Sequence, residues 1–217
     1  MLTLAPERPG ALAAIRQLTA AGVIVSLGHA DADAPATLQA IEAGATCVTH
    51  VFNAMRPLHH RVPALVGTAL IHAGLRLGLI ADGLHVAPEI CHLVFAAARG
   101  RVMAVSDAIP LAGLPPGTTG TFGGARITLD PQGLARRPDD TISGAGILLD
   151  EALRRLIAMG IPPAQALQAA TQTPADALAR PDLGRIQQGA TADLVLWDET
   201  WHPIRIWIAG QELPLHE

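Results

Sequence analysis

The sequence predicts an α/β fold in which parallel strands alternate with helices, as in part of a (β/α) barrel. Four apolar runs with strand character, residues 23–29, 46–50, 77–85 and 102–107, each end on a residue that can bind a metal ion or move a proton. In a parallel (β/α) arrangement the carboxyl ends of the strands meet at one edge, where such enzymes place their catalytic groups. We therefore expect His29, His50, His85 and Asp107 to converge on one site.

The first half of the chain follows this order of strand and helix. A short strand is expected within residues 2–7 and a helix over 9–21, which ends at Gly22. A helix over 34–43 has Asp33 in the N-cap position and Gly44 at its end. Two further helices are predicted over residues 62–73 and 90–97, the second of which has apolar residues at helical spacing.

The rhythm changes after residue 107. Residues 108–141 are rich in Gly, Pro and Thr, and we interpret them as a β-hairpin excursion with loops. Helices are predicted over 147–159, 163–170 and 174–178. Strand-like runs at 193–197 and 204–208 follow, with a turn at Gly210 and Gln211. The predicted organisation is an incomplete barrel domain over 1–180 and the C-terminal strands of a small β-domain over 181–217.

Composition narrows the function classes. The 217 residues are 50% hydrophobic and 16% charged, which is a globular composition. No apolar run approaches the roughly 18 residues of a membrane span, and the first residues lack signal-peptide character, so we expect a cytoplasmic protein that contacts no membrane. The net charge of −4 and the lack of basic tracts argue against nucleic-acid binding. All 15 basic residues are arginine, which excludes lysine chemistry such as a Schiff base.

The two histidines on successive strands carry the chemical hypothesis. Parallel neighbours lie about 4.8 Å apart, so His29 and His50 can share one ion, and zinc commonly takes imidazole together with carboxylates. A structural role remains the alternative for each histidine. Asp107 suits a general base that takes a proton from water and passes it to the leaving group, and a loop or cap role is its alternative.

The loop after His50 offers two further candidates. Asn53 can hydrogen-bond a sugar hydroxyl or an amide, or it can form an Asx turn. Arg61 can recognise a phosphate, or it can be a solvated surface charge. The sequence pattern leaves both pairs of alternatives open.

Several motifs in order resemble one family. Gly28-His29, Thr49-His50-Val51-Phe52-Asn53-Ala54-Met55, Ala81-Asp82-Gly83-Leu84-His85, Ser106-Asp107-Ala108 and Ile142-Ser143-Gly144 closely resemble the motif series of the N-acetylglucosamine-6-phosphate deacetylases, in the amidohydrolase superfamily. The resemblance covers essentially the whole chain. It implies strands 4–8 of the metal-dependent hydrolase barrel, with part of a small β-sandwich domain.

The resemblance also implies an activity and its residues. The activity is metal-dependent hydrolysis of the acetamide of N-acetylglucosamine 6-phosphate to glucosamine 6-phosphate and acetate. The metal is a divalent ion, with zinc favoured over iron, and the partners are the amino-sugar phosphate and a second subunit in a homodimer. His29 and His50 are implied as metal ligands and Asp107 as the catalytic acid and base. The implied substrate-binding residues are Asn53, Ala54, Arg61, Asp82, Gly83, Leu84, His85, Ile142, Ser143 and Gly144.

One departure from the family pattern weakens these expectations. The chain lacks the His-Leu-Glu-Gly-Pro-like motif whose glutamate completes the metal site in the family. Two imidazoles alone make a weak zinc site, and five strands leave two open sheet edges that favour association. Our hypothesis is a truncated or mis-started deacetylase, or a half that needs a complementing chain, with little or no activity by itself. The alternatives are an amidohydrolase of cyclic amides and an inactive half-barrel.

Overall fold

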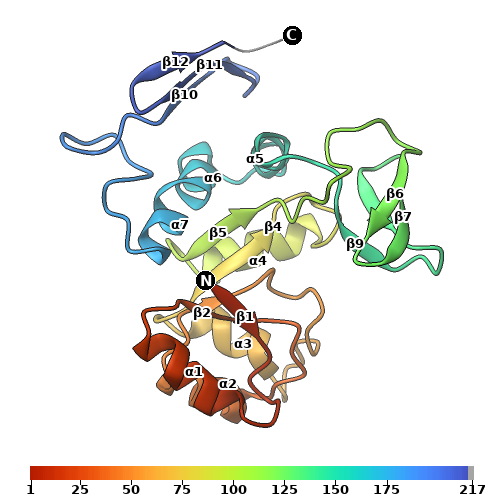
Figure 1. The fold of residues 1–217 in the computed structure, drawn as a ribbon, viewed down its shortest axis with the longest axis vertical. Helices are drawn as coiled ribbons and strands as arrows, with labels where there is room; N and C mark the ends of the chain where they lie inside the picture. The colour runs from red at the N-terminus through yellow and green to blue at the C-terminus, as the bar shows by residue number, and fades with distance from the viewer. Residues whose placement is uncertain (215–217) are drawn as a thin grey trace.

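The computed structural model describes residues 1–214, and its centre is a five-stranded parallel sheet in the order β1-β2-β3-β4-β5 (Figure 1). The strands are β1 (Leu2–Leu4), β2 (Val25–Leu27), β3 (Cys47–Val48), β4 (Arg76–Ile80) and β5 (Val102–Val105). The helices that join successive strands are α1 (Ala11–Ala20), α2 (Ala34–Glu42), α3 (Ala64–Ile71) and α4 (Pro88–Ala97). The predicted α/β class and the alternation of strands with helices are confirmed.

The two faces of the sheet differ because side chains alternate along each strand. One face carries large aliphatic residues that pack in the main core, among them Val25, Leu27 and Leu77. The other face carries small and hydroxyl residues near the carboxyl ends of β1, β2 and β3. There, Thr49 Oγ1 lies 2.8 Å from Thr3 Oγ1 and 2.6 Å from Ser26 Oγ. This polar face leads toward the predicted site residues.

The helix α2 begins as the sequence predicts. Asp33 is extended, and its side chain accepts a hydrogen bond of 2.9 Å from the backbone N–H of Ala36. This bond satisfies one of the N–H groups that have no partner within a helix's first turn.

Replacing Asp33 by alanine should therefore lower the free energy of unfolding by about 1 kcal/mol, the usual cost of losing such a cap. Urea unfolding followed by circular dichroism measures the change. Asp33→Asn is the matched control, because asparagine retains a capping oxygen and should leave stability nearly unchanged. Equal stability of the alanine variant and the wild type would show that this cap contributes nothing.

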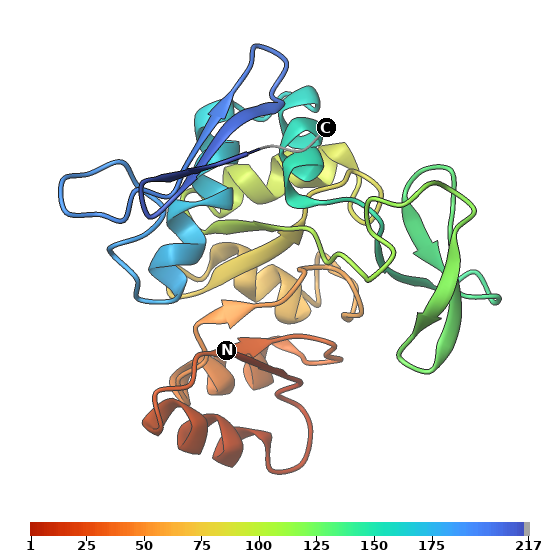
Figure 2. The same ribbon diagram turned by 45° about the horizontal axis from the view of Figure 1, so that its top comes forward.

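The predicted hairpin excursion is larger than expected. Residues 119–145 form a four-stranded antiparallel sheet that lies beyond β5 (Figures 1 and 2), with strands β6 (Thr119–Phe122), β7 (Ala125–Leu129), β8 (Leu134–Arg136) and β9 (Ile142–Ala145). The prediction of a hairpin excursion ending at residue 141 was wrong. The sequence did not reveal β8 and β9, because they are short and contain small or charged residues without a clear alternating pattern. A small core of its own, formed by Ile109, Ile127, Leu129 and Ala135, holds this sheet together.

The remaining elements follow the predicted order. The helices are α5 (Leu149–Ala158), α6 (Pro163–Ala170) and α7 (Gln172–Ala177). The strands β10 (Leu194–Trp197), β11 (Pro203–Ile208) and β12 (Gln211–Leu213) form a separate antiparallel sheet. Its last turn falls at Ala209 and Gly210, one residue earlier than predicted. Residues 215–217 of the predicted small β-domain lie outside the described residues.

The central sheet has two open edges. Within residues 1–214, β1 pairs with β2 alone and β5 pairs with β4 alone. Leu2 on the β1 edge is 42% exposed. The predicted pair of open sheet edges is therefore present among these residues, and exposed edge strands can template association with another chain. Among the described residues, no helix combines the length and hydrophobicity needed to cross a bilayer.

Candidate active site

Three predicted site residues follow the carboxyl ends of strands in the parallel sheet and share an unusual backbone conformation. His29 follows β2, His50 follows β3 and Asp107 follows β5, and their φ angles are 49°, 28° and 53°. The left-handed region costs free energy for residues other than glycine, and such strain collects at functional sites. In this chain the left-handed residues lie where the backbone leaves each strand.

These residues open into one cavity of about 660 Å³. Nine of the residues predicted from the sequence line it: His29, His50, Asn53, Ala54, His85, Asp107, Ile142, Ser143 and Gly144. The Asn53 amide lies 3.4 Å from the carbonyl oxygens of His50 and Val51. These bonds are long, so the local turn does not fully occupy the amide, and it remains available to a ligand.

The two histidine rings meet inside the cavity. Their Nε2 atoms lie 3.0 Å apart. His50 is 7% exposed, and its Nδ1 is buried with no hydrogen-bond partner in the described part of the chain. Burial lowers the pKa of His50, which favours the neutral ring that can bind a metal.

The pair fits a divalent transition-metal ion in ligand type and spacing. Two nitrogen ligands at the usual zinc distance of about 2.0–2.1 Å are about 3.3 Å apart in a tetrahedral site. The number of ligands is too small for a complete site. Residues 1–214 contain no group of three or more histidine, cysteine or acidic side chains placed to hold a metal ion. Within those residues, the arrangement offers two imidazoles, those of His29 and His50, that could contact one ion.

A second pair, Asp82 and His85, lies in the turns after β4. The predicted strand ran to His85, but β4 ends at Ile80, and residues 81–85 turn back instead. Asp82 Oδ2 lies 2.6 Å from His85 Nδ1, and Oδ1 accepts the backbone N–H groups of Leu84 and His85 at 2.9 Å. Burial alone raises the pKa of Asp82, but these hydrogen bonds outweigh it and hold the pKa below its usual value.

The Asp82 carboxylate is therefore ionised and can only accept, so His85 Nδ1 carries the proton. His85 Nε2 then has no hydrogen-bond partner in residues 1–214, although it is buried. Since His85 lines the cavity, this ring nitrogen is the group it offers to a ligand. Asp82 itself is 3% exposed, and its carboxylate holds the His85 ring through Nδ1.

Two glycines permit the close packing of this site. Gly144 has a φ of 107°, and a Cβ there would lie 2.8 Å from the carbonyl oxygen of Asp107. A Cβ at Gly78 would lie 3.1 Å from the backbone nitrogen of His50. Larger residues at either position would displace the segment that carries a cavity side chain.

Four predicted residues do not line the cavity, namely Arg61, Asp82, Gly83 and Leu84. Arg61 is exposed in the loop before α3. Five residues that the sequence analysis did not single out do line it: Thr49, Ile80, Phe122, Arg137 and Thr141. Three of the five come from the antiparallel excursion, whose size the sequence did not reveal. The adjacent Arg136 and Arg137 were the available signal, but a basic pair alone does not indicate a cavity.

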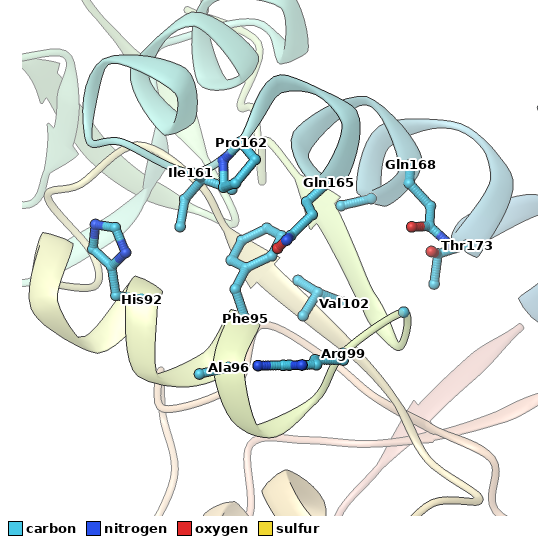
Figure 3. Close-up of a pocket in the computed structure, with 12 residues that line it drawn as sticks. His92, Phe95, Ala96, Arg99, Val102, Ile161, Pro162, Gln165, Gln168 and Thr173 are labelled. Carbon is cyan, nitrogen blue, oxygen red and sulfur yellow. The ribbon is translucent and has the colours of Figure 1, made fainter.

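A separate cavity of about 460 Å³ lies between α4 and α6 (Figure 3). Phe95, Val102 and Ile161 supply much of its apolar lining, and Arg99, in the turn after α4, and Gln165, in α6, also line it. None of the predicted site residues lines it. His92, its one histidine, already lies with Nε2 2.8 Å from the Met159 carbonyl oxygen. The histidines and the aspartate of the proposed chemistry therefore belong to the larger cavity.

The fold and the site agree with a family assignment. The amidohydrolase family model matches residues 9–213, and the chain belongs to this family.

Individual relatives match nearly the whole of this chain. The chain is 37% identical over 213 residues to the N-acetylgalactosamine-6-phosphate deacetylase of Escherichia coli O157:H7, covering 97% of this chain and 56% of that protein. It is 37% identical over 218 residues to the human N-acetylglucosamine-6-phosphate deacetylase, covering 97% and 53%. The chain thus spans about half the length of the curated relatives it matches.

Solved structures share the fold of this chain. A Mycobacterium smegmatis N-acetylglucosamine-6-phosphate deacetylase variant in complex with N-acetylglucosamine 6-phosphate superposes with a TM-score of 0.90 at 36% identity, covering 97% of this chain and 56% of that one. The Thermotoga maritima deacetylase superposes with a TM-score of 0.92 at 28% identity, covering 98% and 58%.

Proposed function

We propose that this chain contributes the metal-binding and catalytic groups for hydrolysis of the acetamide of N-acetylglucosamine 6-phosphate, giving glucosamine 6-phosphate and acetate. The observation that carries the proposal is the cavity that holds His29, His50, His85 and Asp107 together at the ends of parallel strands. Relatives that match 97% of this chain, and of which it covers about half, carry this activity in their names.

Asp107 acts as the proton carrier in this proposal. Its carboxylate takes a proton from the attacking water and passes it to the amine nitrogen as the carbon–nitrogen bond breaks. His85 Nε2 holds a polar group of the substrate, with Asp82 fixing the ring from behind. Asn53 and the backbone of Ala54 bind the sugar, and Ile142, Ser143 and Gly144 form the opposite wall.

A divalent ion, with zinc favoured over iron, would be held by His29 and His50. When bound, such an ion polarises the substrate carbonyl and makes water more acidic. We propose that turnover by this chain is low, because two imidazoles hold an ion weakly and supply no charge to balance it.

The remaining organisation is part of the same proposal. Residues 1–180 would be the catalytic domain, with β1–β5 corresponding to strands 4–8 of the hydrolase barrel, and 181–217 would belong to a small β-domain. Arg61 lies outside the cavity of its own chain, so a role in holding the sugar phosphate would be exercised in a homodimer. The protein would act in the cytoplasm on a small molecule.

The proposal is tested by acetate release. The purified chain is incubated with N-acetylglucosamine 6-phosphate over a series of zinc and iron(II) concentrations. We expect slow acetate release that requires added metal and saturates with it. Absence of release at every metal concentration would overturn the proposed activity for this chain, and metal-independent release would overturn the role of the histidine pair.

The 4-epimer of the substrate is a second candidate. The E. coli relative, which acts on N-acetylgalactosamine 6-phosphate by its name, is as similar to this chain as the human N-acetylglucosamine-6-phosphate enzyme. The two hexosamines differ only in the orientation of one hydroxyl. Running both phosphosugars in the same acetate assay decides between them by the ratio of their kcat/KM values.

A further inference from the structure

We propose that Arg137 determines the preference of this cavity for a phosphorylated sugar. The inference rests on the proposed function and names the residue that would select its substrate class. Arg137 lines the same cavity as His29, His50 and Asp107, and it is the one arginine in that lining. Arg61, which the family resemblance favours for this role, is absent from it.

The Arg137 side chain is held in position but keeps most of its donors. Its Nε donates a 2.8 Å hydrogen bond to Ser143 Oγ, which belongs to β9 and also lines the cavity. A guanidinium has five N–H donors in a fixed planar fork, so four remain. Within residues 1–214 no carboxylate forms an ion pair with Arg137, whereas Arg136 next to it is paired with Asp130 and Asp140.

The backbone around Arg137 is also fixed. Its N–H donates to the Thr141 carbonyl at 2.9 Å, and its own carbonyl accepts from the Asp140 N–H at 3.0 Å. Asp139 lies in the same turn, and its Oδ1 accepts the Thr141 N–H at 3.1 Å. The tight turn over 137–141 therefore presents the guanidinium on the cavity wall with little freedom left to lose.

The chemistry of the substrate explains why a cation is needed on this wall. An N-acetylhexosamine 6-phosphate carries its acetamide at carbon 2 and its phosphate on carbon 6, on opposite sides of the sugar ring. The acetamide must reach Asp107, whose negative charge repels the phosphate. A planar guanidinium binds phosphate oxygens through paired hydrogen bonds between opposite charges, which a sugar without a phosphate cannot form.

Calorimetric titration with glucosamine 6-phosphate and with glucosamine tests the inference, because these products bind without turnover. We expect the wild type to bind the phosphorylated sugar more tightly. Arg137→Ala should weaken that binding about 10- to 100-fold, the usual range for loss of a charge-assisted contact, and leave glucosamine unchanged. Arg137→Lys, a point charge without the planar fork, should restore part of the preference.

Arg126→Ala is the matched control, since Arg126 is an exposed arginine on β7 of the same excursion and lies outside the cavity lining. Thermal unfolding of each variant checks that it is folded, and Arg137→Gln replaces the alanine variant if that one unfolds. A wild type that binds both sugars equally would contradict the proposed substrate class itself. A wild type that discriminates, with discrimination retained in Arg137→Ala and lost in Arg61→Ala, would overturn the role of Arg137 alone.

Discussion

Replacing His29 and His50 together by alanine should abolish metal binding by the chain. Their Nε2 atoms lie 3.0 Å apart in the cavity, and we propose that they are the ligands of one ion. Loss of a supporting partner to a metal ligand already costs about 10–100-fold in affinity, so loss of both ligands should cost at least about 100-fold. Equilibrium dialysis against zinc with elemental analysis measures the bound metal per chain.

The matched control is the double variant His72→Ala with His202→Ala. Both of these histidines lie outside the cavity lining, and the variant removes the same number of imidazoles. It should bind zinc as the wild type does. If the two double variants lose zinc equally, or if neither loses any, the ion is held somewhere else on the chain.

Replacing Asp107 by asparagine should lower turnover by about 10²- to 10⁴-fold, the usual contribution of a general acid and base. Asparagine has the same shape but cannot take the proton from water or return it to the amine. Because Asp107 is exposed at the cavity and its backbone is already left-handed, a conformation that asparagine tolerates, the fold should be unaffected. Acetate release at saturating metal and substrate gives kcat.

The zinc content of the variant shows whether Asp107 acts as the acid and base or as a ligand of the ion. The Asp107→Asn variant should keep the zinc content of the wild type, because we assign the ion to the two histidines. Glu199→Gln, at an exposed acidic residue far outside the cavity lining, should change neither quantity. Loss of zinc together with activity in Asp107→Asn would make the aspartate a ligand, and unchanged activity would remove it from the chemistry.

The strand ends were predictable because a short apolar run followed by His29, His50 or Asp107 is a local signal. Because parallel strands end at the same edge of a sheet, the order of the strands alone brings these residues together. The start of α6 was equally local, since Pro163 suits the first turn of a helix, and the structure has the predicted range of residues 163–170. Asp33 at the start of α2 is a third case, where one side chain and one backbone N–H decide the element.

The rest of the site depends on contacts between distant parts of the chain. The antiparallel excursion was underestimated because β8 pairs with β9 through short strands, one of which reads Leu134-Ala135-Arg136. Arg137 was missed for the same reason, since only the pairing with Ser143 places it on the cavity wall. Asp82 was expected to line the pocket, whereas the turn after β4 places its carboxylate beneath His85.

In the proposed site, the imidazoles of His29 and His50 share one ion at the carboxyl edge of the parallel sheet. X-ray absorption at the zinc edge, on the chain loaded with one equivalent of zinc, tests it most directly. We expect two imidazole nitrogens at about 2.0–2.1 Å, with water oxygens completing the shell, and loss of the imidazole signal in the His29→Ala, His50→Ala variant. Zinc surrounded by oxygen alone in the wild type, or an imidazole signal that survives in the double variant, would show that His29 and His50 do not share the ion.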